Sequence, residues 1–425
     1  MKAKIYPLTN TPSEIEAIAS SFCLHIEIIC ASLAKGTSII KNIIDSKDID
    51  TTISWCKGIG ATIKKSNDKL IIKGVNNIIN YQTPLFVCGN TSITAKLMLP
   101  LLCTSQQPAG IKANEKIINE IVSYKKILDE FDISFYLEND MVRFEKVMKA
   151  KDSEIDGDID IYFAAGLLIA FPLLKAPSVL KLRAPIRCEK NYATILKILK
   201  HFHIDIKHPA TMRYDIAGNQ SYKACRIKTD TDKFTLAHYS IISHLLKVDS
   251  EPIQVTNYVR GSESEDKLLF DYIKSNVVSF KTIFTKRTLR QKDVKVHRMD
   301  ASIENSLPLL MVLATINKQD SIITRVDFTK ERVNKQFEIM QRIFTKLNID
   351  VTTYEREVIV SPSKVQIKKQ VDCENDPYVA MAISILALIS NVAIVIKNVD
   401  CVFDINANFF KDLKRYGAVI EFIHN

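Results

Sequence analysis

Two stretches of the sequence place a lysine beside groups that bind anions or move protons. In LFVCGNTSITAKLMLP, Gly89 and Asn90 precede an expected helix start, and Lys96 follows within it. The open N–H groups of a helix start suit a phosphate. In DFTKERVNKQF, Lys330 and Glu331 stand together at a second expected helix start. Taken alone, a Gly-Asn pair also marks a turn, and a Lys-Glu pair is also common on a solvated helix.

The charge balance is compatible with anionic ligands. The chain has 58 Lys and Arg against 48 Asp and Glu, a formal net charge of +10. An excess of this kind suits small phosphates or nucleic acid. The whole sequence is rich in Ile and Lys, however, so compositional bias accounts for the same excess. No basic run is interleaved with aromatic residues, so we expect no nucleic-acid partner.

The elements that must position these residues recur along the chain. An apolar helix end, a Gly, Asp, His or Asn hinge and a strand of alternating apolar residues recur at intervals of about 71 residues. A second series, helix then short loop then strand, has the same period. The first series is anchored at Ala61, Ile133, Ile204, Val278, Ile349 and Ala418, and the second at Ile39, Ile111, Leu180, Ile253, Ile323 and Ile394.

Six such units fill the chain, each with the order strand, helix, strand, helix, strand, strand. The polar segment at 228–234 separates the third unit from the fourth. The sequence therefore predicts an α/β protein of two similar globular domains, with helices inward and sheets outward in each. We expect a first lobe at 11–231 and a second lobe formed by 1–10 and 232–425.

Cysteine content and hydropathy favour the cytoplasm. The nine cysteines are scattered without a CxxC pair, which indicates a reducing compartment and no structural metal. The longest apolar stretch, YFAAGLLIAFPLL, has 13 residues and contains a proline, so it is too short to span a bilayer. The N-terminal segment has no apolar core of a secretory signal. We expect a monomer with no membrane partner, no metal and no cofactor.

The unit order, the spacing and several local segments resemble the enolpyruvyl transferases, and within them the 5-enolpyruvylshikimate-3-phosphate synthases. The segments are LFVCGN, TKER, ENDPYVAMAISILAL and FFKDLKRYGA. The resemblance covers the whole chain and implies an inside-out α/β barrel in each lobe. It also implies transfer of the enolpyruvyl group of phosphoenolpyruvate to shikimate 3-phosphate, a step of aromatic amino acid (chorismate) biosynthesis.

The resemblance implies a role for individual residues. Glu331 would serve in proton transfer and Lys330 would meet phosphate. Asn90, Thr91 and Lys96 would bind phosphoenolpyruvate, with Lys112 at its carboxylate. Lys190 and Tyr192 would bind the phosphate of shikimate. The position of the general base falls on Ser306, with Asp300 or Glu304 as neighbouring candidates.

Other positions depart from the family pattern. Hydroxyl or cationic residues of the family are replaced here by Asn10, Ile15, Asp160, Glu189, Asn334, Pro377, Tyr378 and Asp404. Acidic residues facing a phosphate would oppose its binding.

Two alternatives to the interpretation as a synthase therefore remain. One is a catalytically impaired homologue that keeps the fold as a binding protein. The other is an enolpyruvyl transferase for another acceptor. For a reactive cysteine of the related UDP-N-acetylglucosamine transferases, the nearest residue is Cys103, in what reads as a helix end.

Overall fold

The computed structural model divides the chain into two compact units. It describes residues 1–8, 14–77, 79, 81, 84–89, 92–138, 140–145, 147–157, 159–184, 189–233, 235–239, 253–259, 278–283, 286–291, 298–300, 305–316, 319–366, 368–406 and 408–423. The first lobe comprises Ala19–Asp230 with Val259–Ser264. The second lobe comprises Met1–Ile18, Thr231–Tyr258 and Glu265–Asn425.

In the described residues, each lobe shows three sheets of four strands. In every sheet the first two strands are parallel and the others are antiparallel. The first-lobe sheets are, in spatial order, β14 (Arg226–Lys228), β3 (Thr37–Lys41), β5 (Lys69–Lys73) and β4 (Thr62–Ser66); β6 (Leu85–Val87), β7 (Ala109–Lys112), β9 (Met141–Glu145) and β8 (Ser134–Glu138); and β10 (Ser153–Asp156), β11 (Ser178–Arg183), β13 (Arg213–Ile216) and β12 (Ile206–Ala210).

The second-lobe sheets repeat this order. They are β2 (Glu14–Glu16), β15 (Ile253–Thr256), β17 (Lys286–Gln291) and β16 (Val278–Ile283); β18 (Arg298–Asp300), β19 (Ser321–Thr324), β21 (Glu357–Val360) and β20 (Val351–Tyr354); and β22 (Gln370–Asp372), β23 (Ile394–Lys397), β1 (Lys2–Ile5) and β24 (Ile420–Ile423). The predicted α/β class and six-unit organisation are confirmed.

The two series of anchors locate the strands as predicted. Every anchor of the second series lies within the second strand of its sheet, from Ile39 in β3 to Ile394 in β23. The hinge residues adopt the left-handed conformation that ends a helix, with φ of 106° at Gly60 and 62° at Asp132. The same holds for His203, Asn348 and Gly417. The hinge before Val278 lies outside the described residues.

Two short strands each complete a sheet of their own lobe beside a strand that is distant in the sequence. The parallel partner of β3 is β14, which comes after the third unit, and the parallel partner of β15 is β2, which comes before the first. Similarly, β1 supplies a strand to the last sheet of the chain. β2 thus pairs with the second lobe although it falls in the range 11–231 predicted for the first. The lobe limits themselves stay a prediction.

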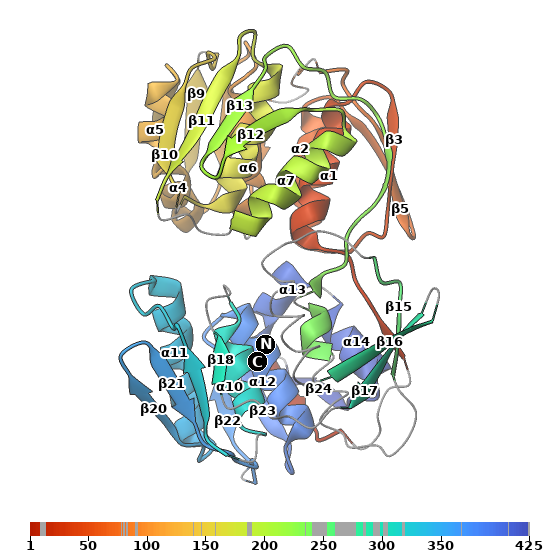
Figure 1. Ribbon diagram of the computed structural model, residues 1–425, viewed down its shortest axis with the longest axis vertical. Coiled ribbons are helices and arrows are strands. Elements are labelled where there is room, and N and C mark those ends of the chain that lie inside the picture. The colour runs from red at the N-terminus through yellow and green to blue at the C-terminus, as the bar shows by residue number, and fades with distance from the viewer. Residues whose placement is uncertain are drawn as a thin grey trace. The chain divides into compact units, whose positions relative to one another are not determined.

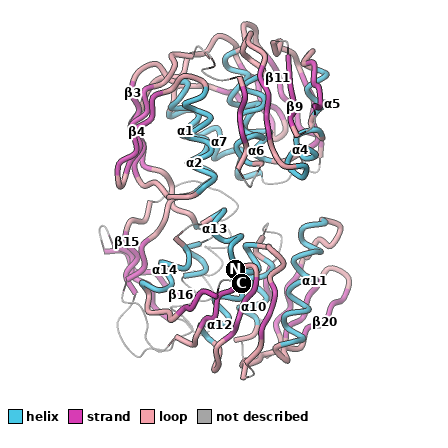
Figure 2. Tube along the Cα trace, turned by 180° about the vertical axis from the view of Figure 1, so that it is seen from behind, coloured by secondary structure: helices cyan, strands magenta, loops and turns pink. Residues whose placement is uncertain are grey.

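Helices fill the interior of each lobe. Figure 1 shows β12, β13 and β11 outside α6 in the first lobe, and Figure 2 shows β3 and β4 outside α1 and α2. The first-lobe helices are α1 (Ser21–Leu33), α2 (Lys47–Gly58), α3 (Ile93–Leu102), α4 (Glu115–Val122), α5 (Lys125–Glu130), α6 (Ile161–Ala170) and α7 (Glu189–His201). The second-lobe helices are α10 (Leu307–Ala314), α11 (Glu331–Lys346), α12 (Pro377–Ile389), α13 (Val402–Ile405) and α14 (Phe409–Arg415).

Sequence pattern decides which helices are central. Every residue of α10 is buried, as are Val379 to Leu388 of α12 and Cys23 to Leu33 of α1. A helix that is apolar on all sides is stable only when it is surrounded. By contrast, α11 buries one stripe, including Phe337, Met340 and Phe344, and exposes the other side. Several candidate site residues lie at or near helix starts, among them Lys96 of α3, Lys190 of α7, Ser306 before α10 and Lys330 before α11.

Candidate active site

In the first lobe, Lys96 lies between two carboxylates. Its Nζ is 3.0 Å from Glu120 Oε2 and 2.9 Å from Asp160 Oδ2. The lysine side chain is only 12% exposed, whereas those of Glu120 and Asp160 are 34% and 32% exposed. The predicted anion-binding lysine is therefore already engaged by two anions of its own lobe.

Close packing of α3 on α6 brings these groups together. A Cβ added at Gly166 of α6 would lie 2.5 Å from the carbonyl oxygen of Leu97 and 2.9 Å from that of Lys96, so only glycine permits this approach. Asp160 precedes α6 and caps it by accepting the N–H of Tyr162 at 2.9 Å. Asp160 is thus fixed by its own helix while it contacts Lys96.

Hydrogen bonds and charges perturb the titration of this cluster. Burial acts to lower the pKa of Lys96, but the charges and hydrogen bonds of Asp160 and Glu120 raise it above its usual value. Burial acts to raise the pKa of Glu120, but the hydroxyl of Ser92, which donates to it, and the charge of Lys96 lower it. Lys96 and Glu120 are therefore held in their charged forms.

Two stacked aromatic side chains lie next to this cluster. The ring of Tyr124 stacks on Phe163 of α6 with centroids 3.9 Å apart and planes 2° apart. Burial raises the pKa of the Tyr124 hydroxyl, and the charges of Asp160 and Glu120 raise it further. Tyr124 and Glu120, both missed by sequence reasoning, belong to the same constellation as Lys96.

Three further predicted binding residues lie in separate surroundings. Lys112 ends β7, is 50% exposed and pairs with Asp140 at 3.1 Å. Lys190 is half-buried in the first turn of α7. Tyr192 is buried, and its ring stacks on Tyr214. These positions are compatible with a structural role for Tyr192, and its substrate contact stays a prediction.

In the second lobe, Lys330 and Glu331 begin α11 beside a cavity. Lys330 is the N-cap residue and Glu331 the first helical residue. The cavity has a volume of about 670 Å³ and lies between the loop after β19 and the β20–β21 turn. Within the described parts of the chain, no carboxylate forms an ion pair with Lys330. The charged lining residues are Arg325, Asp327, Lys330, Glu355, Arg356 and Glu357.

One carboxylate of this cavity is fixed locally. The Thr329 hydroxyl donates to Asp327 Oδ1 at 2.6 Å, and Arg356 lies 3.8 Å from the same oxygen. The Thr329 hydrogen bond lowers the pKa of Asp327, with smaller contributions from Lys330 and Arg356. Asp327 is thus an anion with defined partners, and Lys330 forms no ion pair within the described residues.

The starts of three second-lobe helices meet at Gln336. This buried side chain of α11 donates to Asp376 Oδ2 at 3.2 Å and lies 3.5 Å from Asn305 Oδ1. Asp376 caps α12 by accepting the N–H groups of Tyr378 and Val379 at 2.9 Å. Sequence reasoning missed Gln336, although its place on the buried stripe of an amphipathic helix was a usable signal.

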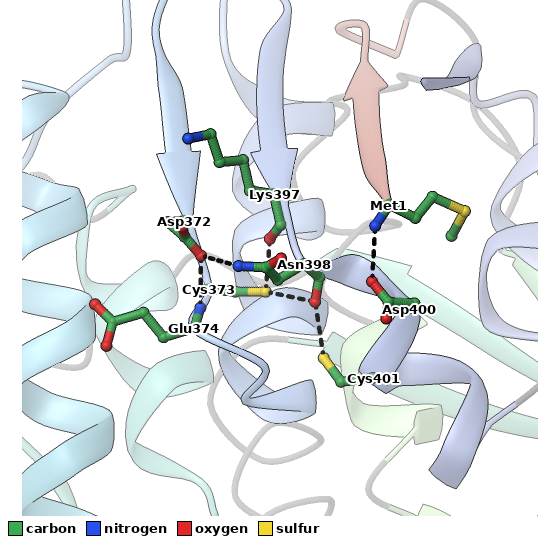
Figure 3. Close-up of polar contacts among 8 residues, drawn as sticks. All are labelled: Met1, Asp372, Cys373, Glu374, Lys397, Asn398, Asp400 and Cys401. Atoms are coloured by element: carbon green, nitrogen blue, oxygen red, sulfur yellow. Dashed lines mark hydrogen bonds and ion pairs between the residues drawn. The ribbon is translucent and has the colours of Figure 1, made fainter. Parts of the chain in front are cut away.

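A tight turn holds the start of α12 in place (Figure 3). Asp372 Oδ1 accepts from Asn398 Nδ2 at 2.7 Å and from the N–H of Glu374 at 2.9 Å. The thiols of Cys373 and Cys401 both donate to the carbonyl of Asn398, each at 3.1 Å. The turn ties the ends of β22 and β23 together and so positions the ENDP segment that leads into α12.

The remaining candidates are only partly described. Ser306 is fully buried before α10, where its carbonyl accepts the Leu310 N–H at 2.9 Å. Asn334 lies in α11 and donates to Glu338 at 2.9 Å. Asn10, Asn90, Thr91 and Glu304 lie outside the described residues, as do the side chains of Ile15, Glu189, Asp300 and Asp404.

Cys103 caps the C-terminal end of α3, as the sequence predicts, and is buried. Burial raises the pKa of its thiol well above the usual range. A thiol in such surroundings is a poor nucleophile.

Among the described residues, no group of three or more His, Cys, Asp or Glu side chains could hold a metal ion. No helix of the described chain is long and apolar enough to cross a membrane.

Two lobes of three four-stranded sheets around central helices, with cations and carboxylates at the helix starts, define the enolpyruvyl transferase class of fold. Solved structures bear this out. An EPSP synthase from Acinetobacter baumannii superposes with a TM-score of 0.82 at 15% identity, covering 99% of this chain and 100% of that one. The enolpyruvyl transferase NikO from Streptomyces tendae has a TM-score of 0.74 at 14% identity, covering 99% and 98%.

Sequence comparison narrows the class to a family. The family model for EPSP synthase (3-phosphoshikimate 1-carboxyvinyltransferase) matches residues 8–413, so the chain belongs to the EPSP synthase family. A 3-phosphoshikimate 1-carboxyvinyltransferase from Clostridium perfringens is 24% identical over 426 residues, covering 99% of this chain and 100% of the relative. One from Clostridium acetobutylicum is 24% identical over 404 residues, covering 93% and 92%.

Proposed function

We propose that this protein transfers the enolpyruvyl group of phosphoenolpyruvate to the 5-hydroxyl of shikimate 3-phosphate and releases inorganic phosphate. Family membership over residues 8–413 supports the proposal. The observation that carries it is the Lys330–Glu331 pair. A cation without a carboxylate partner among the described residues stands beside a possible proton donor, at the start of a helix that borders a cavity.

The chemistry requires a proton to move twice. The methylene carbon of phosphoenolpyruvate is protonated while the acceptor oxygen bonds to the adjacent carbon. A proton then leaves the new methyl group as the bond from carbon to the phosphate oxygen breaks. We propose Glu331 as the group that gives the proton and takes it back. Lys330 stabilises the departing phosphate, because a positioned cation favours a developing negative charge.

The acceptor hydroxyl also loses a proton. Ser306, Asp300 and Glu304 are the candidates for this step by position. Ser306 is buried at the start of α10, where its carbonyl oxygen accepts a backbone hydrogen bond, and the choice among the three candidates stays open. Lys112 and Lys190 are proposed to supply further charge for the two anionic substrates.

The test is the release of inorganic phosphate by purified protein given phosphoenolpyruvate and shikimate 3-phosphate. Glu331→Gln removes the proton while keeping the shape, and we expect kcat to fall by about 10²- to 10⁴-fold. Glu338→Gln makes the same chemical change on an exposed position of the same helix and should leave turnover unchanged.

The two failures of this test are distinct. Phosphate release that is equal in Glu331→Gln and the parent protein would remove Glu331 from the mechanism. A folded parent protein that releases no phosphate would refute the activity. If that protein still bound shikimate 3-phosphate, the alternative of a binding protein with this fold would take its place.

A further inference from the structure

The cluster around Lys96 differs from the other candidate cations in its charge balance. Lys96 brings one positive charge to two negative charges, and both ion pairs are within 3.0 Å. Lys112 shares its charge with one exposed carboxylate, and Lys330 has none among the described residues. The next cation that acts on the cluster is Lys116, one turn before Glu120 on α4.

The two carboxylates are held in place by contacts of their own. Ser92, at the start of α3, donates its hydroxyl to Glu120. The N–H of Tyr162 donates to the other oxygen of Asp160, opposite the one that meets Lys96. Neither carboxylate is a mobile surface group that happens to touch a lysine. An anionic ligand that approaches Lys96 must therefore displace an oriented carboxylate or accept its repulsion.

We propose that Glu120 and Asp160 are specificity-determining residues that compete with anionic ligands for Lys96. This inference rests on the proposed function, because it concerns the affinity of the same site for phosphoenolpyruvate. The carboxylates weaken a phosphate or carboxylate at Lys96 and favour the hydroxyl groups of a ligand, to which they can accept hydrogen bonds. They act on substrate affinity and take no part in the proton transfers.

The size of the effect follows from charge and distance. A carboxylate about 5 to 6 Å from a bound anion, in the intermediate polarity of a partly buried site, opposes binding by on the order of tenfold. Neutralising one carboxylate also leaves the positive charge of Lys96 less compensated, so the lysine attracts an anionic ligand more strongly. The other carboxylate still pairs with the lysine, so the single variants should stay folded.

The experiment measures binding of phosphoenolpyruvate and of inorganic phosphate by titration calorimetry. Asp160→Asn can keep the cap on α6, and Glu120→Gln can keep the hydrogen bond from Ser92. We expect each variant to bind both probes about tenfold more tightly than the parent protein. Under turnover, the KM for phosphoenolpyruvate should fall while kcat stays within about twofold.

A matched control separates this effect from a general change in charge. Asp129→Asn removes one negative charge from an exposed ion pair with Lys125 on α5 of the same lobe, and it should leave both affinities unchanged. Unchanged or weaker binding in both cluster variants, with melting temperatures near that of the parent, would overturn the proposal. An equal gain in the Asp129 variant would do the same.

The binding assay and the turnover assay distinguish failure of this inference from failure of the proposed function. Tighter binding in the cluster variants without any phosphate release would support this inference and refute the proposed activity. Phosphate release by the parent protein with no gain in affinity in the variants would support the activity and refute this inference.

Discussion

The buried carboxyl of Glu27 makes the stability of the first lobe depend on pH. Glu27 lies on α1, is only 2% exposed and accepts a hydrogen bond from the Thr229 hydroxyl at 2.6 Å. Burial raises its pKa from 4.5 to about 8, and the hydrogen bond from Thr229 opposes that rise. Around neutral pH the folded protein therefore holds a proton on Glu27 that the unfolded chain releases.

The direction of this pH dependence follows from proton linkage. Between pH 4.5 and about 8 the folded state binds more protons than the unfolded state, so the free energy of unfolding falls as the pH rises through this window. Each pH unit lowers the free energy of unfolding by about 1.4 kcal/mol, so the loss amounts to about 3 kcal/mol by pH 7. Glu27→Gln is neutral at every pH and can still accept the Thr229 hydroxyl. It should be about 3 kcal/mol more stable than the parent at pH 7 and within about 1 kcal/mol of it at pH 5.

Urea denaturation followed by tryptophan fluorescence would measure this difference. The single tryptophan, Trp55, is buried on α2 of the first lobe, so its emission reports the unfolding of that lobe. Glu130→Gln, at an exposed position of α5, is the control and should show no pH-dependent gain. If the Glu27→Gln gain were the same at pH 5 and pH 8, or were a loss, the buried protonated carboxyl would not be the cause.

Two other predictions concern the elements that position the site. Gly166→Ala should lower the free energy of unfolding by about 1 to 3 kcal/mol, because its methyl group would meet the backbone of α3. Gly110→Ala meets the flexible end of Met141 and should cost less; equal losses in the Trp55 assay would contradict the close approach of α3 and α6. Asp376→Ala should lower the melting temperature of the second lobe by removing the α12 cap, a loss of about 1 kcal/mol, whereas Asp376→Asn should keep most of the cap. Calorimetric melting that ranks the two Asp376 variants equally would exclude capping as the reason.

The fold was largely predictable because local signals repeat with one period. Hinges such as Asp132 and Asn348 need a left-handed backbone, and the alternating strands after them need one buried face, so both leave marks in the sequence. The pairing of β2 and β14 was not predictable in the same way. Each has three residues, too few for a clear alternation, and each pairs with a strand that is distant in the sequence.

The site was less predictable because it depends on contacts between helices. Lys96 was identified by its place after the Gly-Asn pair, and Asp160 was identified as a residue that would repel phosphate. That the two meet depends on the packing of α3 against Gly166, which no spacing along the chain reveals. Glu120 was missed because it reads as an ordinary polar residue of the amphipathic helix α4 until its neighbours are known.

The pairing of Lys96 changes what the substitutions in this family member imply. Taken one at a time, an aspartate at position 160 and a glutamate at position 120 would each weaken a phosphate site. Together they make Lys96 the centre of an oriented charge cluster, and Ser92 and Tyr162 hold the two acids in that arrangement. Asp160 accepts the Tyr162 N–H on the oxygen opposite the one that meets Lys96, and Glu120 accepts the Ser92 hydroxyl on the same oxygen that meets Lys96. Two acids that are oriented in this way around one buried lysine fit a site with a kept structure and a lowered affinity for anions.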